Sequence, residues 1–213
     1  MTDWNLAPGD IERLSFEIID AEAPPHDWPS DAWSVIRRMI HTTADFDYIT
    51  SVRMHPRAMA GGVRAIAGGC TIFTDTNMAA AGMPARRLRP YGVEVRCLMG
   101  DPAVAAAATQ DRTTRAYAAV DAVRESLDGN IYVVGNAPTA LFRLVEHITA
   151  GRARPALVVG LPVGFVNAAE SKAALAQTDC PYITALGRKG GSAVAASVIN
   201  ALAELCAGGK KHD

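Results

Sequence analysis

Short apolar runs alternate with amphipathic helical patterns along the last two thirds of the chain. Each run is rich in β-branched residues, which is typical of buried strands. The five runs are Cys70–Thr74, Val93–Leu98, Ile131–Val134, Ala156–Leu161 and Tyr182–Leu186. Strands that alternate with helices favour parallel pairing, because each connection returns across the sheet through a helix. The pattern therefore predicts an α/β protein, a three-layer α/β/α fold with a central, mainly parallel five-stranded sheet.

Capping residues and prolines mark several helix starts between these runs. Asp101 precedes Pro102, Pro138 opens a helical segment, and Ser192 follows two glycines at the start of a long one. Apolar residues at helical spacing form two stripes, which predict that both helices pack on the sheet. The stripes are Ala116, Val120, Val123 and Leu127 in one helix, and Val194, Val198, Leu202 and Leu205 in the other.

The first third of the chain has a different, helical character. Ile11, Leu14 and Ile18 mark one helix, and Trp33, Ile36 and Ile40 mark a second that Ser30 could cap. The connector EAPPHDWP between them carries three prolines, which break helices. Neither an internal repeat nor a linker marks a boundary, so we expect residues 1–213 to form a single α/β domain with an N-terminal helical segment.

Composition narrows the class of protein. Of the 213 residues, 49% are hydrophobic and the mean hydropathy is +0.08, so the chain can bury a core. A formal net charge of −1 argues against charge-driven binding to nucleic acid or to an anionic membrane. The N-terminus has acidic residues where a signal peptide needs positive charge, and no apolar stretch is long enough to span a bilayer. We therefore expect a cytoplasmic protein.

Polar and glycine-rich segments follow four of the five predicted strands. Ligands of open parallel sheets bind beyond the carboxyl ends of the strands, where loops and helix N-termini converge. These segments are Asp75–Met78, Gly135–Thr139, Pro162–Asn167 and Gly187–Ser192. The last one sets Arg188 and Lys189 beside glycines at a helix start, which would suit a phosphate or carboxylate. Both cations could equally be solvated loop charges.

His41 ends the second helix with arginines just before it and acidic residues just after it. Such a setting could poise the imidazole as a proton donor, although a single histidine is more often structural. Asp75, at a strand end, could be a base, a ligand contact or a helix cap. Arg112 and Arg115 lie at a helix start, where an anionic partner would offset the unfavourable dipole, or they could pair with Asp111 or Asp121.

Several familiar chemistries have no signature in this sequence. It has neither a Walker A loop nor GxGxxG, so nucleotide binding has weak support. It has neither GxSxG nor HExxH, which disfavours covalent or zinc-dependent hydrolysis. The four cysteines are far apart and form no CxxC pair, so we expect small buried residues and no metal site.

Five segments, taken in order, resemble the precorrin-8X methylmutase family of corrin biosynthesis. They are RRMIHTTADFDY, FTDTNMAAAGM, VVGNAPTALFRLVE, LVVGLPVGFVNAAESK and GRKGGSAVAASVINALAE. The resemblance extends from about Ile11 to Leu205. The form HTTADFDY looks more like the branch of the family that acts on cobalt-precorrin-8 than the metal-free branch.

The resemblance implies an isomerase that moves a methyl group within ring C, from carbon eleven to carbon twelve, to give cobyrinic acid or its metal-free counterpart hydrogenobyrinic acid. It implies no redox partner, methyl donor or cofactor, since any cobalt would arrive in the substrate. It also implies that His41, which matches the histidine of the family motif, protonates or hydrogen-bonds a ring nitrogen as a general acid. A homodimer with shared pockets is implied as well, and other corrin-pathway enzymes are further candidate partners. The sequence itself supports the dimer only through Trp4, Trp28 and Trp33, which could instead cap the core.

A corrinoid of this kind is a broad apolar disc edged with carboxylates, so it needs flat apolar walls and scattered cations. Candidate contacts are therefore cations, hydroxyl donors, amides and glycine backbone. They are Arg38, Arg115, Arg188 and Lys189; Ser15, Thr42 and Thr43; Asn77 and Asn136; and Gly135 and Gly190. Two other functions stay open: a corrinoid carrier without catalysis, and a flavodoxin-like nucleotide or flavin binder.

Overall fold

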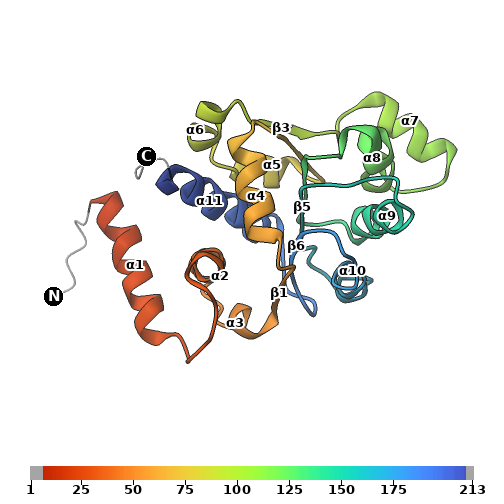
Figure 1. The fold of residues 1–213 in the computed structure, drawn as a ribbon. Helices are drawn as coiled ribbons and strands as arrows, with labels where there is room; N and C mark the ends of the chain where they lie inside the picture. The colour runs from red at the N-terminus through yellow and green to blue at the C-terminus, as the bar shows by residue number, and fades with distance from the viewer. Residues whose placement is uncertain (1–6, 210–213) are drawn as a thin grey trace.

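A computed structural model describes residues 7–209, and these form a six-stranded mixed sheet covered by helices on both faces (Figure 1). The strands are β1 Val52–Met54, β2 Thr71–Thr74, β3 Glu94–Cys97, β4 Ile131–Val134, β5 Leu157–Gly160 and β6 Tyr182–Ala185. Their order across the sheet is β1-β6-β5-β4-β2-β3, and all pairs are parallel except β1 with β6. The predicted fold class and all five predicted strands are confirmed, with bounds that differ by no more than one residue.

The number of strands was underestimated, because β1 was not predicted. It is three residues long, exposes Arg53 and pairs antiparallel with β6 at the edge of the sheet, where Val52 lies opposite Ala185. A segment this short has no alternation that distinguishes it from a loop.

The helices alternate with the strands after residue 70, as predicted. They are α1 Pro8–Glu22, α2 Ser30–Thr43, α3 Tyr48–Ser51, α4 Ala58–Ala67, α5 Asn77–Gly82, α6 Ala85–Leu88, α7 Pro102–Gln110, α8 Arg115–Val123, α9 Pro138–Thr149, α10 Ala168–Leu175 and α11 Ser192–Gly209, with 3₁₀ turns at Arg89–Tyr91 and Arg124–Ser126. The predicted starts at Pro102, Pro138 and Ser192 are confirmed, and Asp101 caps α7 through its side chain. Ser30 does not cap α2: it is the first helical residue and its hydroxyl makes no capping bond.

Side chains of the central strands point alternately into two apolar layers. Ile131 and Val133 of β4 face the layer that contains α2, α4, α5 and α11, whereas Tyr132 and Val134 face the layer of α8, α9 and α10. Figure 1 shows the two groups of helices on opposite sides of the strands. All four residues of β4, β5 and β6 are buried, which is why these strands read as continuous apolar runs.

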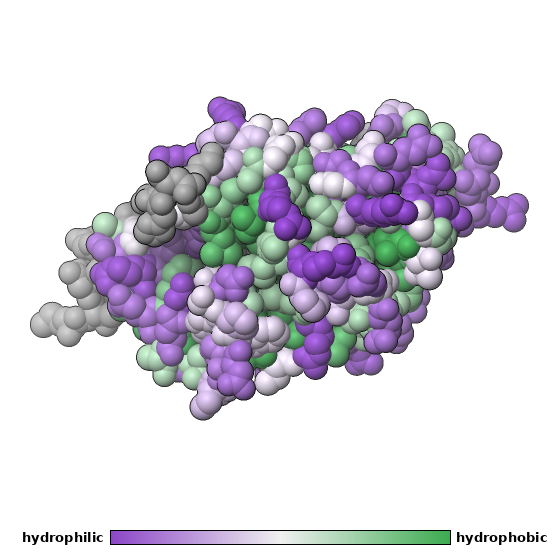
Figure 2. Space-filling model, viewed as in Figure 1, coloured by the Kyte–Doolittle hydropathy of each residue, from purple (hydrophilic) through white to green (hydrophobic). Residues whose placement is uncertain are grey.

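Helix α1 packs on α2, outside the three-layer body (Figure 1). The stripe of Ile11, Leu14 and Ile18 is 49%, 41% and 47% exposed and faces solvent, while Phe16 and Ile19 of the same helix pack inward. Trp28 and Trp33 are half-buried against the core, and Trp4 lies outside the described residues. Hydrophilic and hydrophobic side chains are interspersed over the face shown in Figure 2.

Thiols of all four cysteines are free, and Cys70, Cys180 and Cys206 are buried. Burial raises the pKa of Cys70 to about 11 and that of Cys180 to about 12, so neither is a thiolate near neutral pH. Within residues 7–209, no helix is long and apolar enough to cross a bilayer.

Candidate functional site

Asp75, at the end of β2, organises the loop that follows β4. Its carboxylate is 1% exposed and accepts hydrogen bonds from the backbone N–H groups of Gly135, Asn136 and Ala137, at 2.8, 2.8 and 2.7 Å. Burial raises the pKa of Asp75, and these three hydrogen bonds oppose the rise. Asp75 therefore binds the backbone N–H groups that lead into α9. It does not cap α5, the next helix in the sequence, because the side chain of Thr76 does so.

The start of α11 is joined to the same loops. The hydroxyl groups of Thr76 and Ser192 lie 2.8 Å apart. Gly135 packs directly on this point, because a Cβ built there would lie 2.6 Å from the Cα of Ser192. Only glycine fits such a close approach of two backbones, so Gly135 has a structural reason to lack a side chain.

The segment after β5 supports the loop that joins β6 to α11. The backbone N–H of Gly191 donates to the carbonyl of Leu161 at 2.8 Å, and the N–H of Gly164 donates to the carbonyl of Arg188 at 3.2 Å. A Cβ at Gly190 would collide with the carbonyl oxygen of Leu161. The four segments predicted to converge at the carboxyl edge are therefore connected, with the β6–α11 loop in contact with the other three.

His41 lies in the last turn of α2 with its side chain exposed. Its ring centroid is 5.2 Å from that of Phe16 in α1, and the guanidinium of Arg37 lies 4.5 Å from the same phenyl ring. His41 is accessible and can meet a ligand from outside the chain.

Lys189 connects the end of α2 with the β6–α11 loop. Its ammonium lies 2.6 Å from a carboxylate oxygen of Asp45 and 2.6 Å from one of Asp47, just beyond His41 in the chain. Both carboxylates raise the pKa of Lys189. Burial raises the pKa of Asp45, but the hydrogen bonds from Lys189 and from the N–H of Asp47 outweigh it and lower the pKa overall. Lys189 was expected to meet a substrate carboxylate, yet it already has two partners inside the protein.

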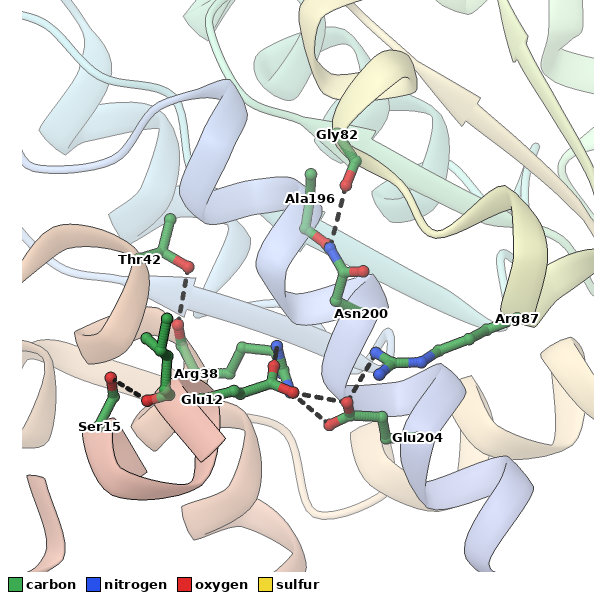
Figure 3. Close-up of polar contacts among 10 residues, drawn as sticks. Glu12, Ser15, Arg38, Thr42, Gly82, Arg87, Ala196, Asn200 and Glu204 are labelled. Carbon is green, nitrogen blue, oxygen red and sulfur yellow. Dashed lines mark hydrogen bonds and ion pairs between the residues drawn. The ribbon is translucent and has the colours of Figure 1, made fainter. Parts of the chain in front are cut away.

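Arg38 is also occupied within the protein (Figure 3). Its guanidinium, with a side chain 10% exposed, lies 2.9 Å from Glu12 in α1 and 2.6 Å from Glu204 in α11. Arg87 in α6 completes the group at 2.6 Å from Glu204. Two cations and two carboxylates balance one another here. Arg38 of α2 therefore joins α1 and α11 through ion pairs. A contact with a substrate carboxylate was expected for it instead.

The three candidate hydroxyl donors make the same internal contact. Ser15, Thr42 and Thr43 each donate to the backbone carbonyl four residues earlier, at 2.7, 2.8 and 2.8 Å. All three are on α1 or the last turns of α2, close in sequence to Phe16 or His41. A hydroxyl in this arrangement can still accept a hydrogen bond, but it donates to a ligand only after its proton rotates away from the helix.

The remaining candidates are exposed around the carboxyl edge. Asn136 and Arg188 lie in strand-to-helix loops, whereas Asn77 opens α5 and Arg115 opens α8. Thr114, beside Arg115, hydrogen-bonds Thr139 of α9 at 2.8 Å, which places the start of α8 next to the β4–α9 loop. Asp121, considered as a partner of Arg112 or Arg115, instead binds Arg143 and His147, at 2.7 and 2.6 Å.

Two features of this edge were not found from the sequence. The first is a set of apolar side chains that point to solvent; they are Met78, Val163, Phe165 and Val166, exposed by 72%, 45%, 85% and 77%. Arg188 lies 5.4 Å from the centre of the Phe165 ring. The second is Lys172, which is fully buried in α10. The apolar residues of the loop segment PVGFV are a sequence signal for the exposed apolar side chains. The sequence of the short helix α10 gives no signal that its lysine is buried.

Other chemical groups of the molecule lie away from this edge. A cavity of about 610 Å³ opens at the opposite, amino edge of the sheet, between Arg57, Arg154, Gln177 and Cys180. In the described part of the chain, no group of three His, Cys, Asp or Glu side chains is placed to hold a metal ion. The carboxyl edge is thus the place where cations, amides and an exposed histidine gather beside apolar side chains.

Comparison with known proteins gives consistent matches over nearly the whole chain. A sequence model of the family Precorrin-8X methylmutase matches residues 10–205. The cobalt-precorrin-8 methylmutase of Salmonella typhimurium is 46% identical, with 92% of this chain and 94% of the relative covered. The precorrin-8X methylmutase of Pseudomonas aeruginosa is 44% identical, with 91% and 93% covered. A crystal structure of the precorrin-8X methyl mutase from Thermus thermophilus superposes with a TM-score of 0.88 at 48% identity, covering 94% of this chain and 97% of that one.

Proposed function

The chain belongs to the precorrin-8X methylmutase family, and from this premise we propose that His41 is the residue that promotes its methyl shift. Membership makes the chain a methyl-shifting isomerase of cobalamin biosynthesis. In the reaction we propose, the bond between the methyl group and carbon eleven of ring C breaks and a bond to carbon twelve forms. Composition and oxidation state are unchanged, so the step consumes no oxidant, reductant or methyl donor, and any cobalt belongs to the substrate.

The accessible imidazole of His41 is the observation that carries this proposal. It stands at the C-terminal end of α2, and Lys189 ties the segment that follows it to the loop bearing Arg188. A protonated His41 would donate to a ring nitrogen and draw electron density through the conjugated system as the methyl group moves. Stabilising charge where it develops in the transition state accelerates a reaction more than holding the ground state does.

The substrate disc would lie on the exposed apolar side chains of the carboxyl edge. Phe165 and Val166 offer a flat apolar wall, and Arg188 stands over the Phe165 ring with its guanidinium exposed. Asn77, Asn136 and Arg115 lie around the same edge to meet peripheral carboxylates. Arg38 and Lys189 would support the site without touching the substrate, because their charges are already paired inside the protein.

We further propose that the physiological substrate is the cobalt form, a homodimer is the working unit and the enzyme is cytoplasmic. The segment HTTADFDY supports the cobalt form. The open, apolar carboxyl edge supports a second copy that covers the disc from the other side. Free cysteines suit a reducing compartment. Comparing turnover of cobalt-precorrin-8 with that of precorrin-8X, and measuring the mass in solution by light scattering, would test the first two.

His41→Ala tests the catalytic role. We expect the first-order rate of the methyl shift, followed by the visible spectrum of the pigment, to fall about a hundredfold or more, while pigment affinity changes only a few-fold. His26→Ala is the matched control, since His26 lies in the connector before α2, with its ring 4.0 Å from Trp33. A His41→Ala enzyme that turns over at the normal rate would refute the assignment. A wild type that binds the pigment unchanged and never converts it would point to a carrier.

A further inference from the structure

Lys172 is a fully buried cation beneath the loop that joins β6 to α11. Its side chain comes from α10 and its ammonium donates a hydrogen bond of 2.6 Å to the backbone carbonyl of Lys189. A charge taken out of water is unfavourable unless it is well paired, and here the acceptor is a neutral carbonyl group. Burial accordingly lowers the pKa of Lys172 to about 8. Because this buried lysine is unfavourable for folding, we looked for a function that it serves in the site.

The carbonyl that Lys172 holds lies at the middle of the loop. On one side, the carbonyl of Arg188 accepts from the N–H of Gly164; on the other, the N–H of Gly191 donates to the carbonyl of Leu161. Both of these contacts are made by the backbone of the segment after β5. Lys172 adds a third point of attachment from a side chain, so the loop is fixed at three of four successive residues.

This loop displays the groups that the proposed function needs. Arg188 is exposed over the ring of Phe165, where a substrate carboxylate would lie. The side chain of Lys189 binds Asp45 and Asp47, just after the helix that carries His41. One buried ammonium therefore supports both the anion-binding edge and the link to the histidine.

We propose that Lys172 is a positioning residue for substrate binding, which holds the main chain at Lys189 so that Arg188 faces a carboxylate of the corrinoid. The inference rests on the proposed function of the Arg188 loop and adds a residue that does not itself touch the substrate. It predicts that stability and binding respond in opposite directions when the lysine is replaced by an apolar side chain of similar length. Removing a poorly paired buried charge favours the fold, whereas releasing the Lys189 carbonyl loosens the loop.

Lys172→Met is the direct test, with cobalt-precorrin-8 as the probe. We expect a melting temperature at or above that of the wild type, a KM raised about tenfold and a kcat within about threefold of normal. Leu175→Met is the matched control: Leu175 is buried on the same helix but packs toward α9, and a volume-conserving swap perturbs α10 without touching Lys189. That variant should keep the wild-type KM.

The outcomes separate this proposal from the proposed function. If the wild type converts cobalt-precorrin-8 and His41→Ala abolishes conversion, but Lys172→Met binds the pigment as tightly as the wild type, the positioning role is refuted and the catalytic assignment stands. If Lys172→Met fails to fold, Lys172→Gln takes its place, because its shorter side chain keeps an N–H donor that cannot reach the carbonyl. A folded Lys172→Gln enzyme with a normal KM, or failure of both variants to fold, would overturn the proposal.

Discussion

The carboxylate of Asp75 accepts a hydrogen bond of 2.8 Å from the backbone N–H of Gly135, across the boundary between β2 and β4. Because two further N–H groups of the same loop donate to this carboxylate, the loop depends on a single side chain from a neighbouring strand. The arrangement fixes the backbone of Asn136 at the edge of the site through a side chain from another strand.

Asp75→Asn should destabilise the protein by about 2–4 kcal/mol. The amide has one acceptor oxygen, and its NH₂ group would face N–H donors that are buried and cannot turn to water. Urea unfolding followed by circular dichroism gives the free energy of unfolding. Asp101→Asn is the control, since Asp101 accepts one N–H at the exposed start of α7, and its replacement should change stability by less than about 1 kcal/mol. Equal losses in both variants would contradict the special role of Asp75.

Arg38→Met and Arg188→Met should separate stability from binding. Loss of Arg38 leaves Glu12 without its partner and Glu204 with Arg87 alone, which we expect to lower the free energy of unfolding by about 2 kcal/mol. Loss of the exposed Arg188 should leave stability unchanged and weaken pigment binding about tenfold, as expected for one charge-assisted contact. Melting curves and spectral titrations measure the two effects. An Arg188→Met enzyme whose bound-state rate collapses at unchanged affinity would show that this contact acts in the transition state.

Phe165→Ser should weaken binding of the pigment about tenfold with little effect on stability. The ring is 85% exposed in the free chain, so its removal affects the fold little, whereas covering it with the substrate would remove its apolar surface from water. Ile18→Ser on the outer face of α1, 47% exposed, serves as the control for loss of a surface apolar group. If both variants bind equally well, the apolar wall lies elsewhere.

Stability should rise with pH above 8 because of Lys172. Burial lowers the pKa of this lysine from 10.5 to about 8, so between these values the unfolded chain carries a proton that the folded chain has released. When the unfolded state binds more protons, the free energy of unfolding increases with pH. Below about pH 8 both states are protonated and the unfavourable burial of the charge is constant. Urea unfolding at pH 7, 9 and 10 should show wild type gaining on Lys172→Met as pH rises; parallel curves for the two proteins would exclude the shift.

The parallel strands of the core could be predicted from the sequence, because a strand buried on both faces is a continuous run of apolar residues. Every residue of β4 is buried, and its boundaries were predicted without error. The exposed stripe of Ile11, Leu14 and Ile18 shows the limit of the same reasoning, since periodicity identifies a helix but not which side of it faces the core. The contact between the loops at the carboxyl edge was also predicted, because strand ends and helix starts carry characteristic residues.

Charge partners could not be predicted, because they depend on contacts between distant parts of the chain. Arg38 meets Glu204 across 166 positions, and Lys189 meets Asp45 across 144. Without these contacts, both cations looked free to bind a substrate carboxylate. The burial of Lys172 could not be predicted for a related reason. Its hydrogen-bond acceptor is a backbone carbonyl 17 residues away, and a residue of any type could supply that carbonyl.

The pairing of β1 with β6, together with the packing of α2 on α11, has a consequence for how the chain is made. During translation, residues 52–54 cannot form their strand pairing until residues 183–185 have been synthesised. Likewise, α2, which bears His41, cannot pack on α11 until that last helix has left the ribosome. The first quarter of the nascent polypeptide is thus exposed to chaperones and proteases for most of translation. A chain released before Ser192 would lack α11 altogether, so we expect such truncated products to be degraded rather than to survive as weak enzymes.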